Sequence, residues 1–236
     1  MRNLVVLILL LSTCKLYAQD VDQLIKRHID AVGGEKNWDK IKTVKVEGVV
    51  EMEGVQIKTT KRIIKDKAWR NDMLFEGKTQ SLKNNKFYVS ILQDKGWKYL
   101  PDSKDDKPEL LDKGEIALYK EEMEFEDPFI HYQSKGTKIS YLNIENVLDV
   151  DYYKFAFTYA SGKQEYIYVR AKDMMIAKRV VYNSDAEDTK DYDYYEKQSN
   201  GIYYPKLIRT NIGVIHIKTV QFNTTIEEKI FLPANG

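Results

Sequence analysis

The chain has 236 residues, with 37 lysines and arginines against 36 aspartates and glutamates. The two signs are mixed along the sequence, and this near-neutral balance argues against nucleic acid as a partner. A chain of this size buries roughly 70% of its unfolded surface, which is enough for one domain with a stable core.

The first segment has the pattern of an export signal. Met1 and Arg2 precede an unbroken apolar run from Leu4 to Leu11, and a more polar exit ends at Ala18. The run is shorter than the roughly 20 residues that a membrane-spanning helix needs. We therefore predict a signal peptide over residues 1–18 and a single periplasmic domain over residues 19–236.

Cys14 leaves a second interpretation open. The string Leu11-Ser12-Thr13-Cys14 resembles a lipobox, whose cysteine is lipidated, although Thr13 fits that pattern poorly. Under this interpretation the protein is a lipoprotein anchored to the membrane through Cys14. If the cut follows Ala18 instead, the exported chain has no cysteine, and its core must form without disulfides.

A helix is predicted directly after Asp20, whose side chain can cap it. Apolar residues then recur at helical spacing as far as Val32. Gly33 and Gly34 end the helix, because glycine tolerates the left-handed conformation found at helix ends. A short helical turn over residues 35–41 follows.

The period then changes to two, which is the spacing of β-strands. Thr43 to Met52 is the clearest case, because Val44 and Val46 alternate there with charged residues. Short turns between such segments require antiparallel neighbours, since a parallel crossover needs a dozen residues or more. The strands predicted in this first meander are 43–52, 55–65, 68–76, 86–93 and 96–100.

A charged loop over residues 101–109 leads to a second amphipathic helix, predicted over residues 110–125 and ended by Pro128. A second meander comes after it. Its predicted strands are 138–142, 152–159, 164–170, 174–182, 189–195, 203–211 and 214–222, with a last short segment at 229–233.

About eleven antiparallel strands and two helical segments define the predicted fold. An open twisted sheet rarely exceeds about ten strands without curling, and two helices cannot cover both of its faces. We therefore predict a mainly β fold, a strongly curved, unclosed β-barrel with helices over its concave face and an apolar cavity inside. The candidate lining of this cavity is Met52, Trp69, Met73, Phe75, Trp97, Phe155 and Phe157. The alternative is that these side chains fill a solid core.

The sequence contains no nucleophile elbow, zinc-protease motif, phosphate loop or dinucleotide fingerprint. We therefore expect neither enzymatic activity nor a cofactor. His28, His131 and His216 are isolated in sequence and predict no metal site. The acidic clusters at residues 121–127 and 185–193 lack the spacing of a calcium loop, so we expect solvated surfaces there.

Six blocks of residues follow one another in a specific order and spacing. They are His28 to Gly34 followed by Trp38 and by Ile41 to Gly48; Gly96 to Pro101; Asp127 to Phe129 with Tyr132 to Gly136; Ser161 to Lys163 with Tyr166 to Val169; Gly201 to Pro205; and Phe231 to Pro233. Together they resemble the outer-membrane lipoprotein-sorting proteins, the LolA-like periplasmic lipoprotein carriers. The resemblance implies an unclosed β-barrel whose helices form a lid over a hydrophobic cavity for acyl chains. Carriers of this family hold the lid shut with an arginine, but no motif transfers that role to Arg62, Arg70 or another arginine here.

We therefore expect a monomeric periplasmic carrier or binder of lipoprotein acyl chains or other lipid, active in outer-membrane lipoprotein sorting. Its partners would be lipids and lipoprotein-handling proteins of the envelope. Ile116, Tyr119 and Met123 are the candidate lid residues, which would cover the cavity when it is empty. The alternative function is a non-enzymatic interaction module with a solidly packed β-barrel, whose exposed edge binds another envelope protein.

Overall fold

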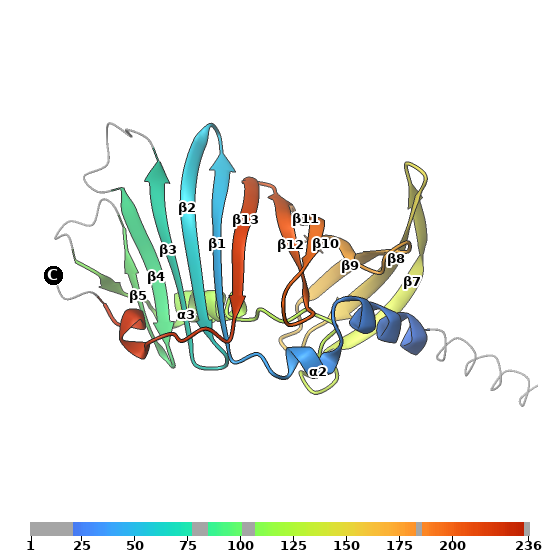
Figure 1. Cartoon of the computed structure of the whole chain (residues 1–236), viewed down its shortest axis with the longest axis horizontal. Coiled ribbons are helices and arrows are strands. Elements are labelled where there is room, and N and C mark those ends of the chain that lie inside the picture. Colours follow the sequence, from blue (N-terminus) through green and yellow to red (C-terminus); the bar gives the residue numbers. More distant parts are fainter. Residues whose placement is uncertain (1–20, 77–84, 101–106, 183–185, 234–236) are drawn as a thin grey trace, which may run out of the picture. The chain divides into compact units, whose positions relative to one another are not determined.

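The computed structural model describes residues 21–76, 85–100, 107–182 and 186–233 (Figure 1). The predicted signal peptide, Cys14 and residues 101–106 of the charged loop lie outside the described residues. Within the described ranges, thirteen strands form one sheet in the order β6-β5-β4-β3-β2-β1-β13-β12-β11-β10-β9-β8-β7. The prediction of a mainly β fold with an unclosed antiparallel sheet is confirmed. The predicted number of about eleven strands is wrong.

The strands are β1 (Thr43–Met52), β2 (Val55–Ile64), β3 (Ala68–Glu76), β4 (Lys86–Leu92), β5 (Lys95–Tyr99), β6 (Glu109–Leu110), β7 (Lys138–Val147), β8 (Val150–Thr158), β9 (Gln164–Arg170), β10 (Ile176–Tyr182), β11 (Glu187–Lys197), β12 (Tyr203–Thr210) and β13 (Gly213–Phe222). The described helices are one over residues 21–31, α2 (Glu35–Trp38) and α3 (Lys113–Glu121), with a short 3-10 helix, η1 (Glu228–Phe231). The predicted last segment at 229–233 is thus largely a 3-10 turn.

Two departures from the predicted elements have local causes. Strand β7 continues to Val147, beyond the predicted end at residue 142. Its register shifts between Tyr141 and Asn143, and the sequence prediction stopped there because this irregularity breaks the alternation of side chains. The helix predicted over residues 110–125 is only nine residues long. Asp112 caps α3 at its start. Leu111, the residue before this cap, donates its backbone N–H to the Gly96 carbonyl of β5 and is therefore not part of the helix.

The chain divides into two compact units. Unit 1 comprises Met1–Glu35 and Asp127–Thr189, and unit 2 comprises Lys36–Glu126 and Lys190–Gly236. Compact units of this kind can belong to one domain or to two, so the single domain over residues 19–236 stays a prediction.

Unit 1 contains the helix over residues 21–31 and the antiparallel strands β7, β8, β9 and β10. Strict alternation along β8 and β9 gives the unit its core: Phe155 and Phe157 on β8 and Ile167 and Val169 on β9 are all completely buried. Side chains two positions apart on a strand point to the same face, so these four residues form one apolar layer.

Unit 2 contains an antiparallel run from β6 through β1 to β13, β12 and the part of β11 from Lys190 (Figure 1). Long β-hairpins connect consecutive strands here; β1 and β2, for example, pair along their full length from Thr43↔Ile64 to Met52↔Val55. Trp38 of α2 is buried and meets Phe222 at the end of β13 edge to face, with 6.4 Å between ring centroids. Helix α2 is thereby fixed to the base of this sheet.

Candidate functional site

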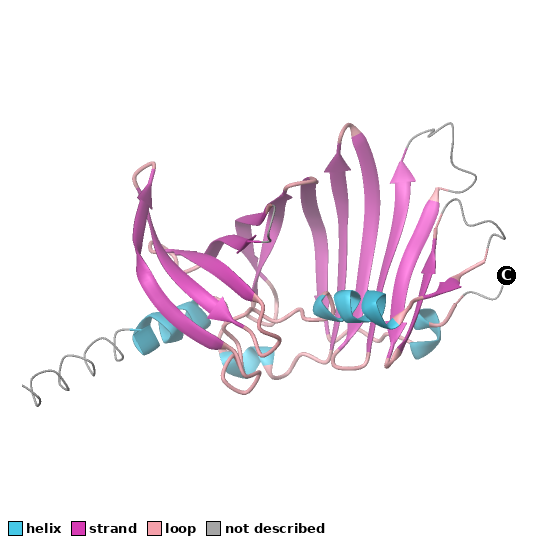
Figure 2. Cartoon of the chain, turned by 180° about the vertical axis from the view of Figure 1, so that it is seen from behind, coloured by secondary structure: helices cyan, strands magenta, loops and turns pink. Residues whose placement is uncertain are grey.

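One face of the unit 2 sheet is mostly apolar, and α3 lies across it (Figure 2). We call it the α3 face. Residues directly opposite each other in paired strands share a face, so the registers define its rows. From one end to the other these rows are Met52–Val55, Val50–Ile57–Phe75, Gly48–Thr59–Met73–Phe87, Val46–Lys61–Asn71–Val89–Lys98, and Val44–Ile63–Trp69–Ile91–Gly96.

Burial changes along this face. In the row next to α3, Val44, Ile63, Trp69 and Ile91 are at most 3% exposed. Farther along the strands the side chains are mostly half-buried, although they are equally apolar: Val50, Met52, Val55, Met73, Phe75 and Phe87. Phe75 and Phe87 contact each other with 5.1 Å between ring centroids. The α3 face therefore has a closed end under α3 and an incompletely covered apolar end.

Helix α3 is placed by a few contacts with the closed end. Tyr119 stacks on Trp69 with 5.6 Å between ring centroids. Leu111 and Ile116 lie directly over Gly96, where a Cβ atom would come within 2.6 Å of a Leu111 methyl carbon and 3.3 Å of the Ile116 side chain. A larger residue at position 96 would therefore require the Leu111 side chain to shift, and glycine leaves room for the α3 segment to approach the sheet.

Local sequence explains why α3 forms with so little burial. Asp112 and Glu115 make a capping box, in which each side chain accepts a hydrogen bond from the other residue's backbone N–H, at 2.8 and 3.0 Å. None of the nine helical residues is buried, and Leu118 is 71% exposed. Capping thus supports a helix that tertiary packing holds only weakly.

Ion pairs connect the α3 segment to lysines of the sheet. Lys98 donates to Glu115 at 2.6 Å, and this hydrogen bond lowers the pKa of Glu115 and raises the pKa of Lys98. Lys61 donates to Glu122, just past the helix, at 2.9 Å. Lys190 lies 4.0 Å from the same carboxylate.

The segment is fixed more firmly at its two ends than in between. Before α3, the side chain of Leu111 is buried and its N–H donates to the Gly96 carbonyl at 2.9 Å. After α3, the buried carboxylate of Glu126 accepts a hydrogen bond from Lys65. Between these two points the α3 segment contacts the sheet through Ile116, the Tyr119 ring and the ion pairs of Glu115 and Glu122.

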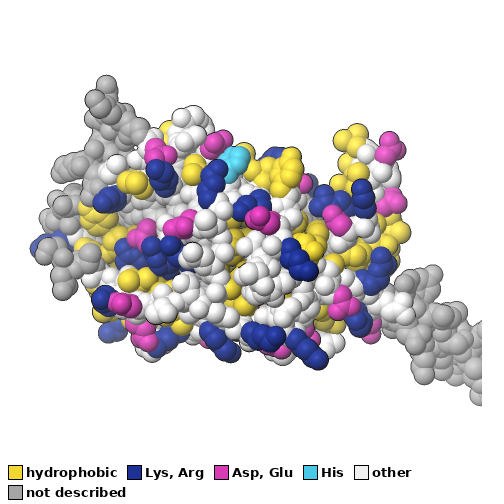
Figure 3. All heavy atoms as spheres, viewed as in Figure 1, with side chains coloured by type: hydrophobic (Ala, Val, Ile, Leu, Met, Phe, Trp, Pro, Cys, Tyr) yellow, Lys and Arg dark blue, Asp and Glu magenta, His cyan; other side chains and the backbone are white. Residues whose placement is uncertain are grey.

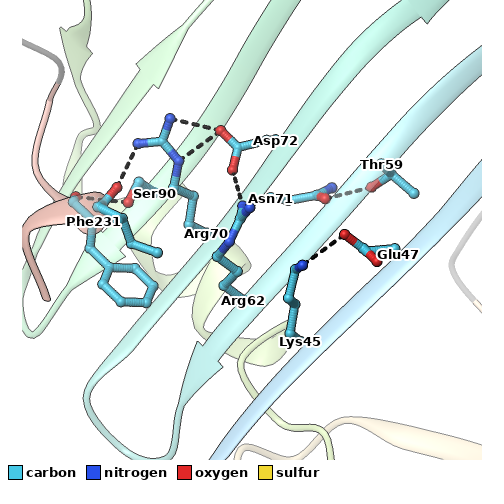
Figure 4. Close-up of polar contacts among 10 residues, drawn as sticks. Lys45, Glu47, Thr59, Arg62, Arg70, Asn71, Asp72, Ser90 and Phe231 are labelled. Carbon is cyan, nitrogen blue, oxygen red and sulfur yellow. Dashed lines mark hydrogen bonds and ion pairs between the residues drawn. The ribbon is translucent and has the colours of Figure 1, made fainter. Parts of the chain in front are cut away.

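The opposite face of the unit 2 sheet is polar. Figure 3 shows positive and negative side chains spread over strands β1 to β5 on the side away from α3. There Asp72 accepts hydrogen bonds from Arg62 at 2.6 Å and from Arg70 at 2.8 Å (Figure 4). Arg70 also donates to the Ile230 carbonyl of η1 at 2.8 Å, and Ser90 donates to the Phe231 carbonyl at 2.8 Å. Helix η1 thus contacts this second face at β3 and β4.

The structure separates the seven predicted lining residues into three groups. Met52, Trp69, Met73 and Phe75 share the α3 face, as their registers show. Trp97 lies on the opposite face, because it pairs with Ser90, which in turn pairs with Arg70. Phe155 and Phe157 belong to the core of unit 1.

Of the predicted lid residues, Ile116 and Tyr119 are part of α3 and are half-buried. Met123 follows the helix in a turn, where its N–H donates to the Lys120 carbonyl at 3.2 Å. Arg62 and Arg70, the arginines considered for a lid-holding role, bind Asp72 on the face away from α3.

The core of unit 1 is built around Phe129. Its ring meets Phe155 and Phe157 edge to face, with centroid distances of 5.3 and 4.8 Å. His28 lies 4.2 Å from the same ring and is completely buried; Nδ1 is 2.6 Å from the Met174 carbonyl and Nε2 is 2.9 Å from an Asp127 carboxylate oxygen. Both imidazole nitrogens face acceptors, so His28 connects the first helix to two loops of its unit.

A second polar cluster in unit 1 is structural. The buried carboxylate of Glu165 accepts hydrogen bonds from Arg179 at 2.6 and 2.8 Å and from the Tyr159 hydroxyl at 2.5 Å. Burial raises the pKa of Glu165, but the hydrogen bonds and charge of Arg179, with the Tyr159 hydroxyl, outweigh this effect and lower it. Burial raises the pKa of Tyr159.

Several residues of the site were missed by sequence reasoning. Ile57, Lys61 and Phe87 lie on the α3 face, and the period of two within residues 55–65 would have placed Ile57 and Lys61 beside Ile63. Nothing in the sequence pairs Lys61 with Glu122, which is 61 residues away.

Among the described residues, no three or more histidine, cysteine, aspartate or glutamate side chains are grouped so that they could hold a metal ion. In the same ranges, no helix combines the length and apolar character that crossing a membrane requires.

Comparison with known proteins identifies the fold of this chain. No family model matches the sequence, and no curated protein matches it. Three solved structures are similar over 88–89% of this chain and 94–97% of their own. They are a DUF1329 family protein from Desulfovibrio piger (TM-score 0.55, 16% identity), a LolA superfamily protein from Nitrosomonas europaea (0.54, 13%) and an outer membrane lipoprotein-sorting protein domain from Vibrio parahaemolyticus (0.53, 12%). The chain therefore has a LolA-like fold, as the sequence resemblance indicated.

Proposed function

We propose that this LolA-like chain is a periplasmic binder or carrier of acyl chains, from lipoproteins or other lipids, and that the acyl chain lies on the α3 face of unit 2. The observation that carries the proposal is the incomplete cover of that face. Val50, Met52, Met73, Phe75 and Phe87 are apolar, adjacent and only half-buried. Contiguous apolar surface that the protein leaves incompletely covered is typical of ligand-binding and interaction sites.

The strength of such binding follows from the apolar surface that it removes from water. Each buried methylene contributes about 0.8 kcal/mol, so one long acyl chain contributes on the order of 10 kcal/mol before the costs of ordering. No catalytic step is part of the proposal. The similar outer membrane lipoprotein-sorting domain from Vibrio supports a role in outer-membrane lipoprotein sorting, and a periplasmic location is part of the proposal.

Helix α3 would act as the lid. It is held to the closed end of the α3 face by the Trp69–Tyr119 stack, by Ile116 and by ion pairs that are open to solvent. An aromatic stack contributes about 0.5–1.5 kcal/mol, which is small beside the burial of an acyl chain. A ligand can therefore displace α3 if it binds the open state better than the closed one.

Paired variants on one strand test the site. Met73 and Leu74 are neighbours on β3 and both are half-buried, but they point to opposite faces. We expect Met73→Asn to weaken binding of a solvent-sensitive fluorescent fatty acid about tenfold, because a polar group replaces apolar contact. Leu74→Asn should leave the affinity unchanged. No fluorescence gain at micromolar wild-type protein, or equal loss in both variants, would contradict the proposal.

An interaction module is the second candidate, and the β7–β8 hairpin of unit 1 favours it. Ile144 and Val147 of the terminal strand β7 are about half exposed, and Leu148 in the turn is 92% exposed. Exposed apolar side chains on a terminal strand are typical of surfaces that bind another protein. Cross-linking in the envelope, lost in a Leu148→Ser variant that still binds fatty acid, would support this candidate.

A further inference from the structure

Lysines occupy positions on the α3 face that the strand pattern would give to apolar residues. On β2, Lys61 lies in the same file as Val55, Ile57 and Ile63, and it is flanked across the strands by Val46 and Asn71. Lys98 lies in the same row on β5. An ammonium group on an apolar surface is costly unless an anion pairs with it.

In this structure the α3 segment supplies the anions. Glu115 pairs with Lys98, and Glu122 pairs with Lys61 and lies near Lys190. The Lys61 and Glu122 side chains are 32% and 47% exposed, so their ion pair lies partly in solvent. Such a pair contributes little to stability, and another anion can replace the carboxylate at small cost.

Displacement of α3 would remove these anions and leave the lysines on the apolar face. A second polar group near Lys61, the indole N–H of Trp69, also lacks a hydrogen-bond acceptor among the described residues. The ring centroid of Trp69 is 6.0 Å from Lys61 Nζ, and the indole Nε1 atom is buried. A negatively charged oxygen that enters as Glu122 leaves would restore an anionic partner to Lys61, and it would bring an acceptor near the side chain of Trp69.

The distances suit an amphiphile with one charged end. From Lys61 to Val55 the same face of β2 continues for six residues, which is about 20 Å at ~3.3 Å per residue. An acyl chain fills one leaflet of a hydrocarbon core about 30 Å thick, so its length is of the order of 15 Å. A head group at Lys61 would thus place the chain across the two rows that contain the half-buried Met73 and Phe75.

We propose that the ligand carried on the α3 face has an anionic head group, a carboxylate or a phosphate, which replaces Glu122 as the partner of Lys61. The inference rests on the proposed function, because it assumes that an acyl chain occupies this face. It adds a ligand class: single-chain or double-chain amphiphiles with a negatively charged oxygen at the head.

Three ligands with one chain length separate the head group from the chain. Dodecanoate, dodecyl phosphate and dodecanol are titrated into the full chain by isothermal titration calorimetry, below their aggregation limits. We expect wild-type protein to bind at least one of the two anions about tenfold more tightly than the alcohol. The stronger of the two anions distinguishes a carboxylate head group from a phosphate.

Matched variants assign the preference to Lys61. Lys61→Gln should remove the preference for the anions over dodecanol. Lys58→Gln is the control, since Lys58 lies on the same strand but on the opposite face, paired with Glu76. Glu122→Gln should increase the preference, because it frees Lys61 without altering the sheet. It also serves as the test if Lys61→Gln does not fold.

The outcomes distinguish the inference from the function on which it rests. Equal affinity for the anions and the alcohol in wild-type protein, or a preference for anions that survives in Lys61→Gln, would overturn the inference and leave acyl-chain binding standing. If none of the three ligands binds, the proposed function fails and the inference fails with it.

Discussion

Replacement of Tyr119 by alanine tests whether α3 is a lid. Tyr119 provides the stacking contact of α3 with Trp69, at 5.6 Å and an interplanar angle of 23°. Loss of such a stack costs about 0.5–1.5 kcal/mol, and the half-buried ring loses apolar contact as well. We therefore expect the free energy of local opening of α3 to fall by about 1–2 kcal/mol.

Amide hydrogen exchange measures this change directly. A decrease of about 1.4 kcal/mol accelerates exchange about tenfold for amides that exchange through local opening. The affected amides should be those of α3 (Lys113–Glu121), while β8 (Val150–Thr158) keeps the protection of global unfolding. Leu118→Ala is the matched control, because this neighbouring side chain is 71% exposed. If the amides of α3 were as protected as those of β8, and Tyr119→Ala did not change them, α3 would be a fixed part of the structure.

Three further predictions concern stability. Phe129→Ala removes a completely buried ring between Phe155 and Phe157 and should cost about 3–5 kcal/mol in chemical denaturation; a cost below 1 kcal/mol would contradict the packing described for unit 1. Leu148→Asn should stabilise the β7–β8 hairpin by about 0.5–1 kcal/mol, because φ is +49° at this residue and asparagine tolerates the left-handed region better than leucine; a lower melting temperature would refute this reasoning. Since the pKa of Glu165 is lowered on folding, its pairing with Arg179 stabilises the protein above pH 4.5, and this contribution is lost as the pH falls through the folded-state pKa; Glu165→Gln should flatten the stability–pH curve in that range, and an unchanged curve would exclude the effect.

Much of the strand architecture could be predicted from the sequence, because the alternation that defines a strand is local. Thr43–Met52 and Gln164–Arg170 have the bounds expected from period two. The two residues of β6 are too few to show any period, so no pattern could have predicted them. The start of α3 was within reach, since Asp112 and Glu115 have the spacing of a capping box.

The sequence was not sufficient to predict which residues share a face of the sheet. Trp69 and Trp97 both lie in alternating strands, and each pattern is compatible with either face. The hairpin between β4 and β5 pairs Leu92 with Lys95, and this register places Gly96 on the α3 face and Trp97 on the opposite one. A shift of one residue would have reversed both, since successive side chains of a strand point to opposite faces.

The sequence by itself determined the class of fold, most of the strands and the resemblance to lipoprotein-sorting proteins, because periodicity and turn residues act over short distances along the chain. The tertiary structure alone decided that Met52, Trp69, Met73 and Phe75 meet on one face and that Phe155 and Phe157 fill another core. It also decided that Lys61 pairs with Glu122. These outcomes depend on strand registers and on contacts between distant residues, and the pattern of a single segment contains neither.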